Sequence, residues 1–248
     1  MTAWARIKRH QANCHTILRS GGGLRAAVSY ASGAATGSRA PIRFRNMMVR
    51  PNTPDMIVVS AMLKGEFTAP IQAASPLRYG FILDCGGYIG TAAIAFAEAF
   101  PGATVVTVEP SPDNFAMLCR NVAAHPNVHP IQAAISARGG VAKLSSRGTG
   151  EWGYSIAVGH EAAGDVETVT IPEIMARYGA RGIDIAKLDI EGAERDVLLN
   201  GADWLPLTRV LFVELHDRIV PGCADAFARA TIGRRAVDCA REKVMSVA

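Results

Sequence analysis

The amino-acid sequence predicts an α/β fold, in which helices cover both faces of a mainly parallel sheet. Two observations lead to this prediction. Short apolar runs, as expected of strands buried on both faces, alternate along the chain with segments of helical periodicity. In addition, a glycine-rich turn joins the first apolar run to the helix that follows it. With 248 residues, of which 49% are hydrophobic, the chain is long enough for one large domain of this kind.

Residues 1–55 form the first segment, which we expect to be an irregular arm. Three consecutive glycines at 21–23 and prolines at 41, 51 and 54 break any long helical period. The arm is also basic, because the first 50 residues carry nine of the 26 Lys and Arg residues and none of the 22 Asp and Glu residues. We therefore expect two parts, a basic N-terminal arm at 1–50 and a folded domain at 51–248.

The charge of the arm leaves more than one role open. A partner-binding extension and an organellar targeting sequence both fit an Arg-rich, acid-poor segment. Secretion is disfavoured, because Arg19 and Arg25 interrupt the apolar core that a signal peptide needs. Nucleic-acid binding is disfavoured as well, because the arm has only three aromatic residues for stacking. The chain also lacks the ~18 consecutive apolar residues of a membrane span, so we expect no membrane partner.

The cysteine pattern indicates the compartment. The five cysteines are odd in number, widely spaced and without a CxxC pair. This pattern fits a reducing cytoplasm and gives no zinc-site spacing, so a metal would have to be held by carboxylates and histidine.

Within the domain, local signals define an alternating series of elements. Helices are expected at residues 56–64, 91–100, 112–124, 172–179, 193–200 and 221–231. Strands are expected at residues 81–85, 104–108, 128–135, 141–145, 166–171, 183–189, 209–215, 236–239 and 244–247, the last two as a terminal hairpin.

The helix boundaries follow from capping residues and helix breakers. Ser111 stands at an N-cap position, before Pro112 as the first helical residue. Pro172 begins a later helix, and Gly179 and Gly201 end two helices. The glycine-rich stretch at 148–164 is expected to be a loop or hairpin between two strands.

A ligand site is expected at the carboxyl ends of the strands, near the point where the strand order reverses. The first strand ends in Asp84 and a turn that runs to Gly90, where glycines permit close approach of a ligand and helix amides follow. The second strand ends in Glu109, at a spacing that suits a carboxylate accepting both ribose hydroxyls. Structural explanations remain open: the glycines could only allow close packing, and Glu109 could only cap the next helix.

The chemical centre is expected after the fourth and fifth strands, because ionisable groups on buried strands need partners or a task. The first of these strands leads into Asp189 and Glu191, and the second into Glu214 and His216. Alternation along an extended strand would place Lys187, Asp189 and Glu191 on one side. A lone histidine at a strand end is more often structural, but the neighbouring Glu214 favours a functional role.

Three further side chains near these strand ends are expected to be structural. Lys187 is expected to pair with a neighbouring carboxylate. Glu194 and Arg195 are expected to lie on a solvated helix face.

Six sequence blocks in order, between Arg50 and Thr231, resemble those of the FkbM-type S-adenosylmethionine-dependent methyltransferase family. The blocks are RPNTPD at 50–55, GEF at 65–67, ILDCGGYIG at 82–90, VEPSPDN at 108–114, KLDIEGAE at 187–194 and VELHD at 213–217. The resemblance implies a Rossmann-like sheet of seven strands with a C-terminal antiparallel hairpin. It also implies that residues 51–248 form a methyltransferase domain with S-adenosyl-L-methionine as cofactor.

The resemblance also implies roles for individual residues at the cofactor site. The turn would hold the methionine part of the cofactor, Glu109 its ribose, and Asp189 would lie beside the methionine amine and the methyl group. The remaining implied cofactor contacts are Asp84, Gly86, Tyr88 and Gly90 in the turn, and Ala134 and Ile135 near the adenine. The turn departs from the DxGANxG pattern of the family, because Gly87 and Tyr88 replace Ala and Asn.

The implied reaction is methyl transfer to a hydroxyl on a sugar, polyketide or other small-molecule metabolite. The expected catalytic residues are His216, Asp189, Glu214 and Glu191. His216 or Asp189 would accept the hydroxyl proton, or a divalent metal ion held by members of this group would ease its loss. The Tyr88 departure leaves a second interpretation, a non-catalytic S-adenosylmethionine-binding module. A nicotinamide oxidoreductase is disfavoured, because the turn does not read GxGxxG.

The expected partner is a small-molecule or glycan acceptor. Because the domain is acidic, we expect the basic arm to dock on its own domain or on a twin subunit of a homo-oligomer, or to help hold an acidic acceptor.

Overall fold

The computed structural model describes residues 2–74, 79–148, 150–159, 161–239 and 242–248. The chain divides into two compact units, Met1–Gly65 and Glu66–Ala248. Among the described residues, none of the helices combines the length and the apolar character needed to span a bilayer.

The N-terminal unit is regular, and the expectation of an irregular arm is wrong. It contains α1 (Ala3–Arg19), α2 (Gly23–Thr36), β1 (Ile42–Phe44), β2 (Met47–Val49) and α3 (Asp55–Leu63). The three glycines form the turn between α1 and α2 instead of preventing helix formation. Gly21 and Gly23 have φ values of 81° and 75°, and Gly22 has no room for a side chain against Phe44 and Ile17. The helices α1 and α2 on either side of this turn contain no proline, so no proline interrupts their helical hydrogen bonds.

A buried ion pair lies in the RPNTPD block of this unit. The guanidinium of Arg50 donates to both carboxylate oxygens of Asp55, each at 3.0 Å, and the Arg50 backbone N–H donates to the same carboxylate at 2.8 Å. The Asp55 side chain is fully buried, and that of Arg50 is 8% exposed. This block therefore holds the segment between β2 and α3 together.

The second unit is built on a seven-stranded, mainly parallel sheet. Its strands, in spatial order, are β12 (Arg235–Asp238), β13 (Lys243–Val247), β11 (Thr208–Glu214), β10 (Ile183–Leu188), β3 (Phe81–Cys85), β4 (Thr104–Val108) and β5 (Val128–Ile131). The strands from β11 to β5 are parallel, and β13 runs antiparallel to both β11 and β12. The Rossmann-like sheet with a C-terminal antiparallel hairpin is thus confirmed.

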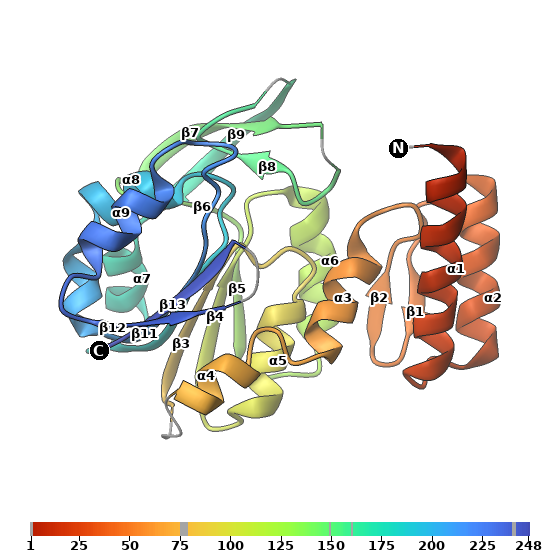
Figure 1. Ribbon diagram of the computed structural model, residues 1–248, viewed down its shortest axis with the longest axis horizontal. Helices are drawn as coiled ribbons and strands as arrows, with labels where there is room; N and C mark the ends of the chain where they lie inside the picture. The colour runs from red at the N-terminus through yellow and green to blue at the C-terminus, as the bar shows by residue number, and fades with distance from the viewer. Residues whose placement is uncertain (1, 75–78, 149, 160, 240–241) are drawn as a thin grey trace. The chain divides into compact units, whose positions relative to one another are not determined.

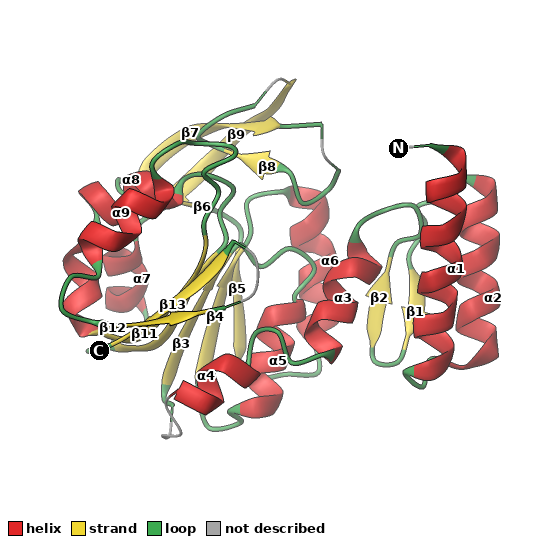
Figure 2. Cartoon of the chain, in the orientation of Figure 1, coloured by secondary structure: helices red, strands yellow, loops and turns green. Residues whose placement is uncertain are grey.

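Helices cover both faces of this sheet, as Figure 2 shows. Those of this unit are α4 (Ala69–Ala74), α5 (Thr91–Ala99), α6 (Pro112–Val122), α7 (Ile171–Arg177), α8 (Glu194–Asn200), the 3-10 helix η1 (Ala202–Leu207) and α9 (Cys223–Ala230). The helices α5 and α6 lie on one face, and α7, α8 and α9 lie on the other (Figure 1). The central strands are therefore buried on both sides, which explains why their sequences are apolar runs without alternation.

A second, four-stranded sheet stands beside the carboxyl edge of the first. Its order is β6 (Ala134–Ile135), β9 (Glu161–Val169), β7 (Gly140–Ser146) and β8 (Tyr154–Ser155). The single strand expected at 128–135 is therefore wrong, because the chain divides it between the two sheets at Gln132 and Ala133. The glycine-rich excursion belongs to the hairpin of β7 and β9.

Candidate active site

The strand order reverses at β3, with β4 and β5 on one side and β10 and β11 on the other. The turn after β3 consequently meets the loop after β10. The backbone N–H of Asp189 donates to the Cys85 carbonyl at 3.0 Å. A Cβ atom at Gly86 would lie 1.9 Å from the Asp189 carbonyl oxygen, and Gly86 has a φ of 90°. Only glycine fits at this junction of the two loops.

The other turn glycines also lie against the protein. A Cβ at Gly87 would lie 2.3 Å from the Thr107 hydroxyl oxygen, and Gly90 supplies a left-handed N-cap to α5. Close packing of the backbone therefore explains these glycines, as the structural interpretation of the sequence allowed. Their contact with a cofactor stays a prediction.

Tyr88 occupies the turn in an uncommon backbone conformation, with a φ of 50°. Bulky residues rarely adopt this left-handed region, whereas Asn does so more readily. The turn therefore keeps the conformation that suits Asn, although Tyr stands there. The backbone N–H of Tyr88 is directed to Glu109, to which it donates at 2.9 Å.

The Glu109 carboxylate lies at the end of β4, beneath this turn. It accepts hydrogen bonds from the backbone N–H groups of Tyr88 and Ser111, both at 2.9 Å, and from the Asn114 side chain at 3.4 Å. Burial raises the pKa of Glu109 to about 7, although these hydrogen bonds and the charge of Lys187 oppose the shift. A carboxylate offers about four acceptor positions, so about one position remains for a ribose hydroxyl.

Asp84 and Lys187 form a buried ion pair between β3 and β10. The Lys187 ammonium lies 3.0 Å from Asp84 Oδ1 and 3.5 Å from Asp189 Oδ2, and it donates to the Gly86 carbonyl at 3.0 Å. The Thr107 hydroxyl donates to the other oxygen of Asp84 at 2.9 Å. Burial lowers the pKa of Lys187, but the two carboxylates outweigh it, so the net shift is upward and the side chain stays charged.

The expected pairing of Lys187 with a carboxylate is thus confirmed. Asp84 is fully buried with protein partners on both oxygens, which indicates that it holds Lys187 and the turn in place. A direct contact of Asp84 with the cofactor stays a prediction.

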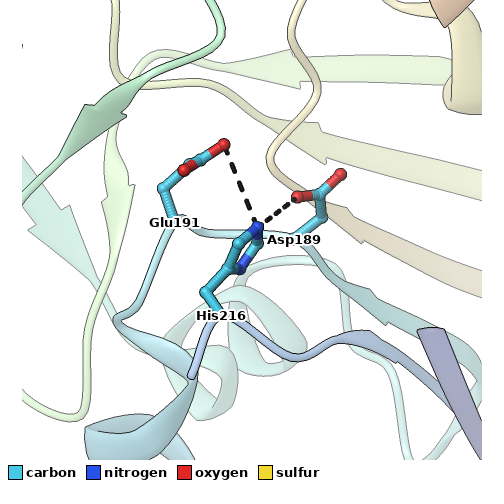
Figure 3. A group of neighbouring side chains, drawn as sticks. All are labelled: Asp189, Glu191 and His216. Atoms are coloured by element: carbon cyan, nitrogen blue, oxygen red, sulfur yellow. Dashed lines mark ion pairs between the residues drawn. The ribbon is translucent and has the colours of Figure 1, made fainter. Parts of the chain in front are cut away.

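His216, Asp189 and Glu191 converge beyond the ends of β10 and β11, as Figure 3 shows. The His216 Nε2 atom lies 3.8 Å from Asp189 Oδ1, 3.9 Å from Glu191 Oε1 and 4.0 Å from Glu214 Oε1. All four expected catalytic side chains are thus neighbours. Glu191 does not follow Asp189 along an extended strand as expected, because β10 ends at Leu188. It lies in the turn that follows, where its φ is 54°.

The prediction that Glu194 lies on a solvated helix face is wrong. Its side chain is fully buried and accepts hydrogen bonds from the backbone N–H groups of Ile190 and Gly192, at 2.7 and 2.8 Å. It also accepts a hydrogen bond from His216 Nδ1 at 2.9 Å. As the first residue of α8, Glu194 reaches back to the free amides that precede the helix. Arg195, the next residue, is exposed as expected.

The electrostatic environment shifts the pKa values of the cluster. Burial lowers the pKa of His216, but the hydrogen bond to Glu194 and the charges of Glu194, Asp189 and Glu191 outweigh this effect. The net result is a pKa raised to about 9. Burial and the charge of Asp189 raise the pKa of Glu191 to about 7, against the opposing charges of His216 and Arg147. Burial likewise raises the pKa of Glu214. The raised pKa of His216 thus reflects the negative charge of the carboxylates around it, which favours the protonated imidazole.

Residues of the β7–β8 hairpin also reach this cluster, and the sequence analysis missed them. Arg147 forms an ion pair with the Glu191 carboxylate, and the Ser155 hydroxyl donates to the Glu191 carbonyl at 2.7 Å. On the other side, Lys243 of β13 lies 3.4 Å from Glu214. No local motif marks these residues, because their partners lie far away in the sequence.

Ala134 and Ile135, the expected neighbours of the adenine, form β6 in the second sheet. Both are buried, Ala134 with Leu144 and Val166, and Ile135 in the main core. An adenine contact through these residues stays a prediction.

The fold and this site define a Rossmann-like protein with a carboxylate-rich centre at the carboxyl edge of its sheet. The family model described as methyltransferase FkbM domain matches residues 84–231. The chain belongs to this family of S-adenosylmethionine-dependent methyltransferases.

A curated relative and solved structures are also similar to the chain. The 2-O-methyltransferase NoeI of Sinorhizobium fredii is 28% identical over 154 residues, covering 55% of this chain and 63% of that protein, less than two thirds of its length. Aeropyrum pernix fibrillarin with natively bound S-adenosyl-L-methionine aligns with a TM-score of 0.44 at 16% identity, over 77% of this chain and 73% of that one. A Bacillus cereus O-methyltransferase in complex with SAH aligns with a TM-score of 0.43 at 13% identity, over 77% and 91%.

Proposed function

We propose that this protein transfers the methyl group of S-adenosylmethionine to a hydroxyl group of a sugar or another small-molecule acceptor. The observation that carries the proposal is the proximity of the two parts of the site in a chain of this family. The cofactor turn and the polar cluster share a junction, where the backbone of Asp189 contacts both Cys85 and Gly86. The name of the relative NoeI, a 2-O-methyltransferase, supports a hydroxyl as the acceptor.

In this mechanism the acceptor oxygen attacks the sulfonium methyl group in line, and the protein supplies alignment and a proton acceptor. Glu109 would hold the ribose hydroxyls, and the turn after β3 would place the sulfur towards Asp189. We assign the proton acceptor to Asp189, because its side chain is 29% exposed and an acceptor can reach it. The His216 side chain is 1% exposed, so it acts as a positioning residue.

The reaction is tested by release of S-adenosylhomocysteine from S-adenosylmethionine, with free monosaccharides and nucleotide-activated sugars as acceptor probes. We expect acceptor-dependent product with the wild-type chain and a strong reduction of kcat with Asp189→Asn. Cofactor binding without product on any hydroxyl-bearing probe or cell extract would favour the non-catalytic binding module.

Replacement of Glu109 is expected to weaken cofactor binding. Hydrogen bonds to a charged group contribute about 1.5–3 kcal/mol, so Glu109→Gln should raise the Kd for S-adenosylhomocysteine by about 10- to 100-fold. Calorimetric titration measures this Kd. The control is Glu98→Gln, the same chemical change on the exposed surface of α5, which should leave the Kd unchanged. Equal affinities of Glu109→Gln and the wild-type chain would remove Glu109 from the ribose site.

The affinity is also expected to depend on pH. The ionised Glu109 accepts the ribose hydroxyls, so below its pKa of about 7 binding must first release a proton. Affinity should therefore rise about tenfold between pH 6 and pH 8. The ammonium of Lys187 faces the same carboxylate but stays charged in this range. Calorimetry at both pH values should show this change in the wild-type chain and not in Glu109→Gln. The same pH dependence in both chains would assign it to another group.

A further inference from the structure

We propose that Asp189, Glu191 and His216 form a binding site for one divalent cation of the Mn²⁺ or Mg²⁺ class. The role of this cation in easing the loss of the acceptor proton rests on the proposed function, whereas its binding does not. The proposal rests on the geometry of three ligand atoms, on the fixed orientation of the imidazole and on the charge balance of the cluster.

The three side chains offer ligand atoms that face one another, and both carboxylates lie at ion-pair distance from the imidazole rather than at hydrogen-bond distance. One imidazole nitrogen and two carboxylate oxygens lie within 4.8 Å of one another. The two distances from His216 Nε2, 3.8 Å to Asp189 and 3.9 Å to Glu191, exceed those of a hydrogen bond. Figure 3 shows that the side chains point to a common region from two loops. A cation between them would satisfy all three.

The orientation of His216 provides a second, independent observation. Only 1% of its side chain is exposed, and its Nδ1 is hydrogen-bonded to Glu194 at 2.9 Å. Glu194 is in turn held by two backbone N–H groups. Nε2 points into the cluster and has no hydrogen bond among the residues that the structure describes. An imidazole whose second nitrogen is bound to a carboxylate is the usual arrangement of a metal-ligating histidine.

The charge balance of the cluster also favours a cation. Within the described part of the chain, the connected ion pairs join six carboxylates, Asp84, Asp189, Glu191, Glu194, Glu214 and Glu66, to the cations Arg147, Lys187 and Lys243 and to His216. The six carboxylates outnumber these four cationic groups even with His216 protonated, and a bound cation would displace the proton of the His216 imidazole. The two carboxylates are ligands that suit Mn²⁺ and Mg²⁺, and the imidazole is a ligand of first-row transition metals, so Mn²⁺ is the better probe of the site. When bound, such an ion acts as a Lewis acid that lowers the pKa of a coordinated hydroxyl.

Arg147 competes with the cation for Glu191. Its guanidinium pairs with Oε2 of Glu191, whereas Oε1 faces His216. Removal of this positive charge should strengthen cation binding, and removal of a ligand should weaken it. The proposal therefore predicts a lower Kd for the cation when Arg147 is replaced and a higher Kd when the ligand Asp189 is replaced.

The experiment is a titration of the full chain with Mn²⁺, followed by calorimetry and by the EPR signal of free Mn²⁺. We expect one Mn²⁺ per wild-type chain and a Kd at least about tenfold higher for Asp189→Asn. Arg147→Gln should lower the Kd about twofold to fivefold. Glu98→Gln, on the exposed surface of α5, is the matched control and should bind as the wild type does.

Two outcomes separate this inference from the proposed function. Wild-type Mn²⁺ affinity in both Asp189→Asn and His216→Ala would overturn the inference, as would the absence of Mn²⁺ binding from a chain that binds S-adenosylhomocysteine. Failure of S-adenosylhomocysteine to bind would instead contradict the proposed function. If His216→Ala fails to fold, Asp189→Asn still tests the inference. The Asp189 side chain is partly exposed, so it tolerates replacement by the isosteric Asn.

Discussion

Gly86→Ala is expected to abolish cofactor binding and to lower the free energy of unfolding by at least about 4 kcal/mol. The new methyl group would lie 1.9 Å from the Asp189 carbonyl oxygen, and alanine also disfavours the φ of 90° at this position. Backbone atoms cannot rotate away as a side chain can, so the turn after β3 and the loop after β10 would have to separate. That separation would break the junction on which both halves of the site depend. Urea unfolding and S-adenosylhomocysteine titration measure the two effects.

Gly102→Ala is the matched control for this substitution. A Cβ at Gly102 meets no atom within 4 Å, and its backbone φ lies outside the left-handed region. Its stability should therefore stay within about 0.5 kcal/mol of the wild type. A folded Gly86→Ala chain with wild-type stability would show that the two loops are not in contact as described.

Lys187→Met is expected to lower the free energy of unfolding by about 3–5 kcal/mol. The substitution keeps most of the apolar stem of the side chain but leaves the fully buried Asp84 carboxylate without its cation. It also removes the donor to the Gly86 carbonyl and the ion pair with Asp189, so the turn loses its support. Urea unfolding at constant pH gives the change in stability, and the slope of the transition shows whether unfolding remains cooperative.

The double variant Asp84→Asn/Lys187→Met tests the cause of this loss. Asparagine removes the uncompensated charge and retains an oxygen for the Thr107 hydroxyl, so the double variant should recover most of the lost stability. Equal stability of the double variant and Lys187→Met alone would mean that lost packing, and not the buried charge, causes the effect.

The sequence predicted the central sheet well, because its signals are local. Apolar runs such as Phe81–Cys85 and Ile183–Leu188 are buried on both faces and show no alternation that could mislead. The edge of the sheet was predictable for the same reason, since a strand that leads into Asp189 or ends in Glu214 places that carboxylate at its carboxyl end. The convergence of Asp189, Glu191, Glu214 and His216 followed from this rule.

The supporting residues could not be predicted, because their partners are remote in sequence. Glu194 has the position of a solvated first-turn residue, and only the loop that returns over it buries the side chain against His216. Arg147 lies in a glycine-rich stretch whose hairpin geometry, not its composition, directs it to Glu191. The N-terminal helices were missed because glycines that form the turn between helices were interpreted as helix breakers.

Two blocks of the family resemblance contain charged residues that form ion pairs with other side chains. Arg50 and Asp55 of the first block pair with each other inside the N-terminal unit. Glu66 of the second block pairs with Lys243, which also lies beside Glu214. These ion pairs show that the blocks of the family resemblance contain structural contacts as well as candidate site residues.

The most direct test of the account is a crystal structure of the full chain with S-adenosylhomocysteine. We expect the ribose hydroxyls on the Glu109 carboxylate and the sulfur directed towards Asp189, with His216 still bound to Glu194. The cofactor product bound elsewhere, or bound at this edge with its sulfur directed away from Asp189, would contradict the proposed active site.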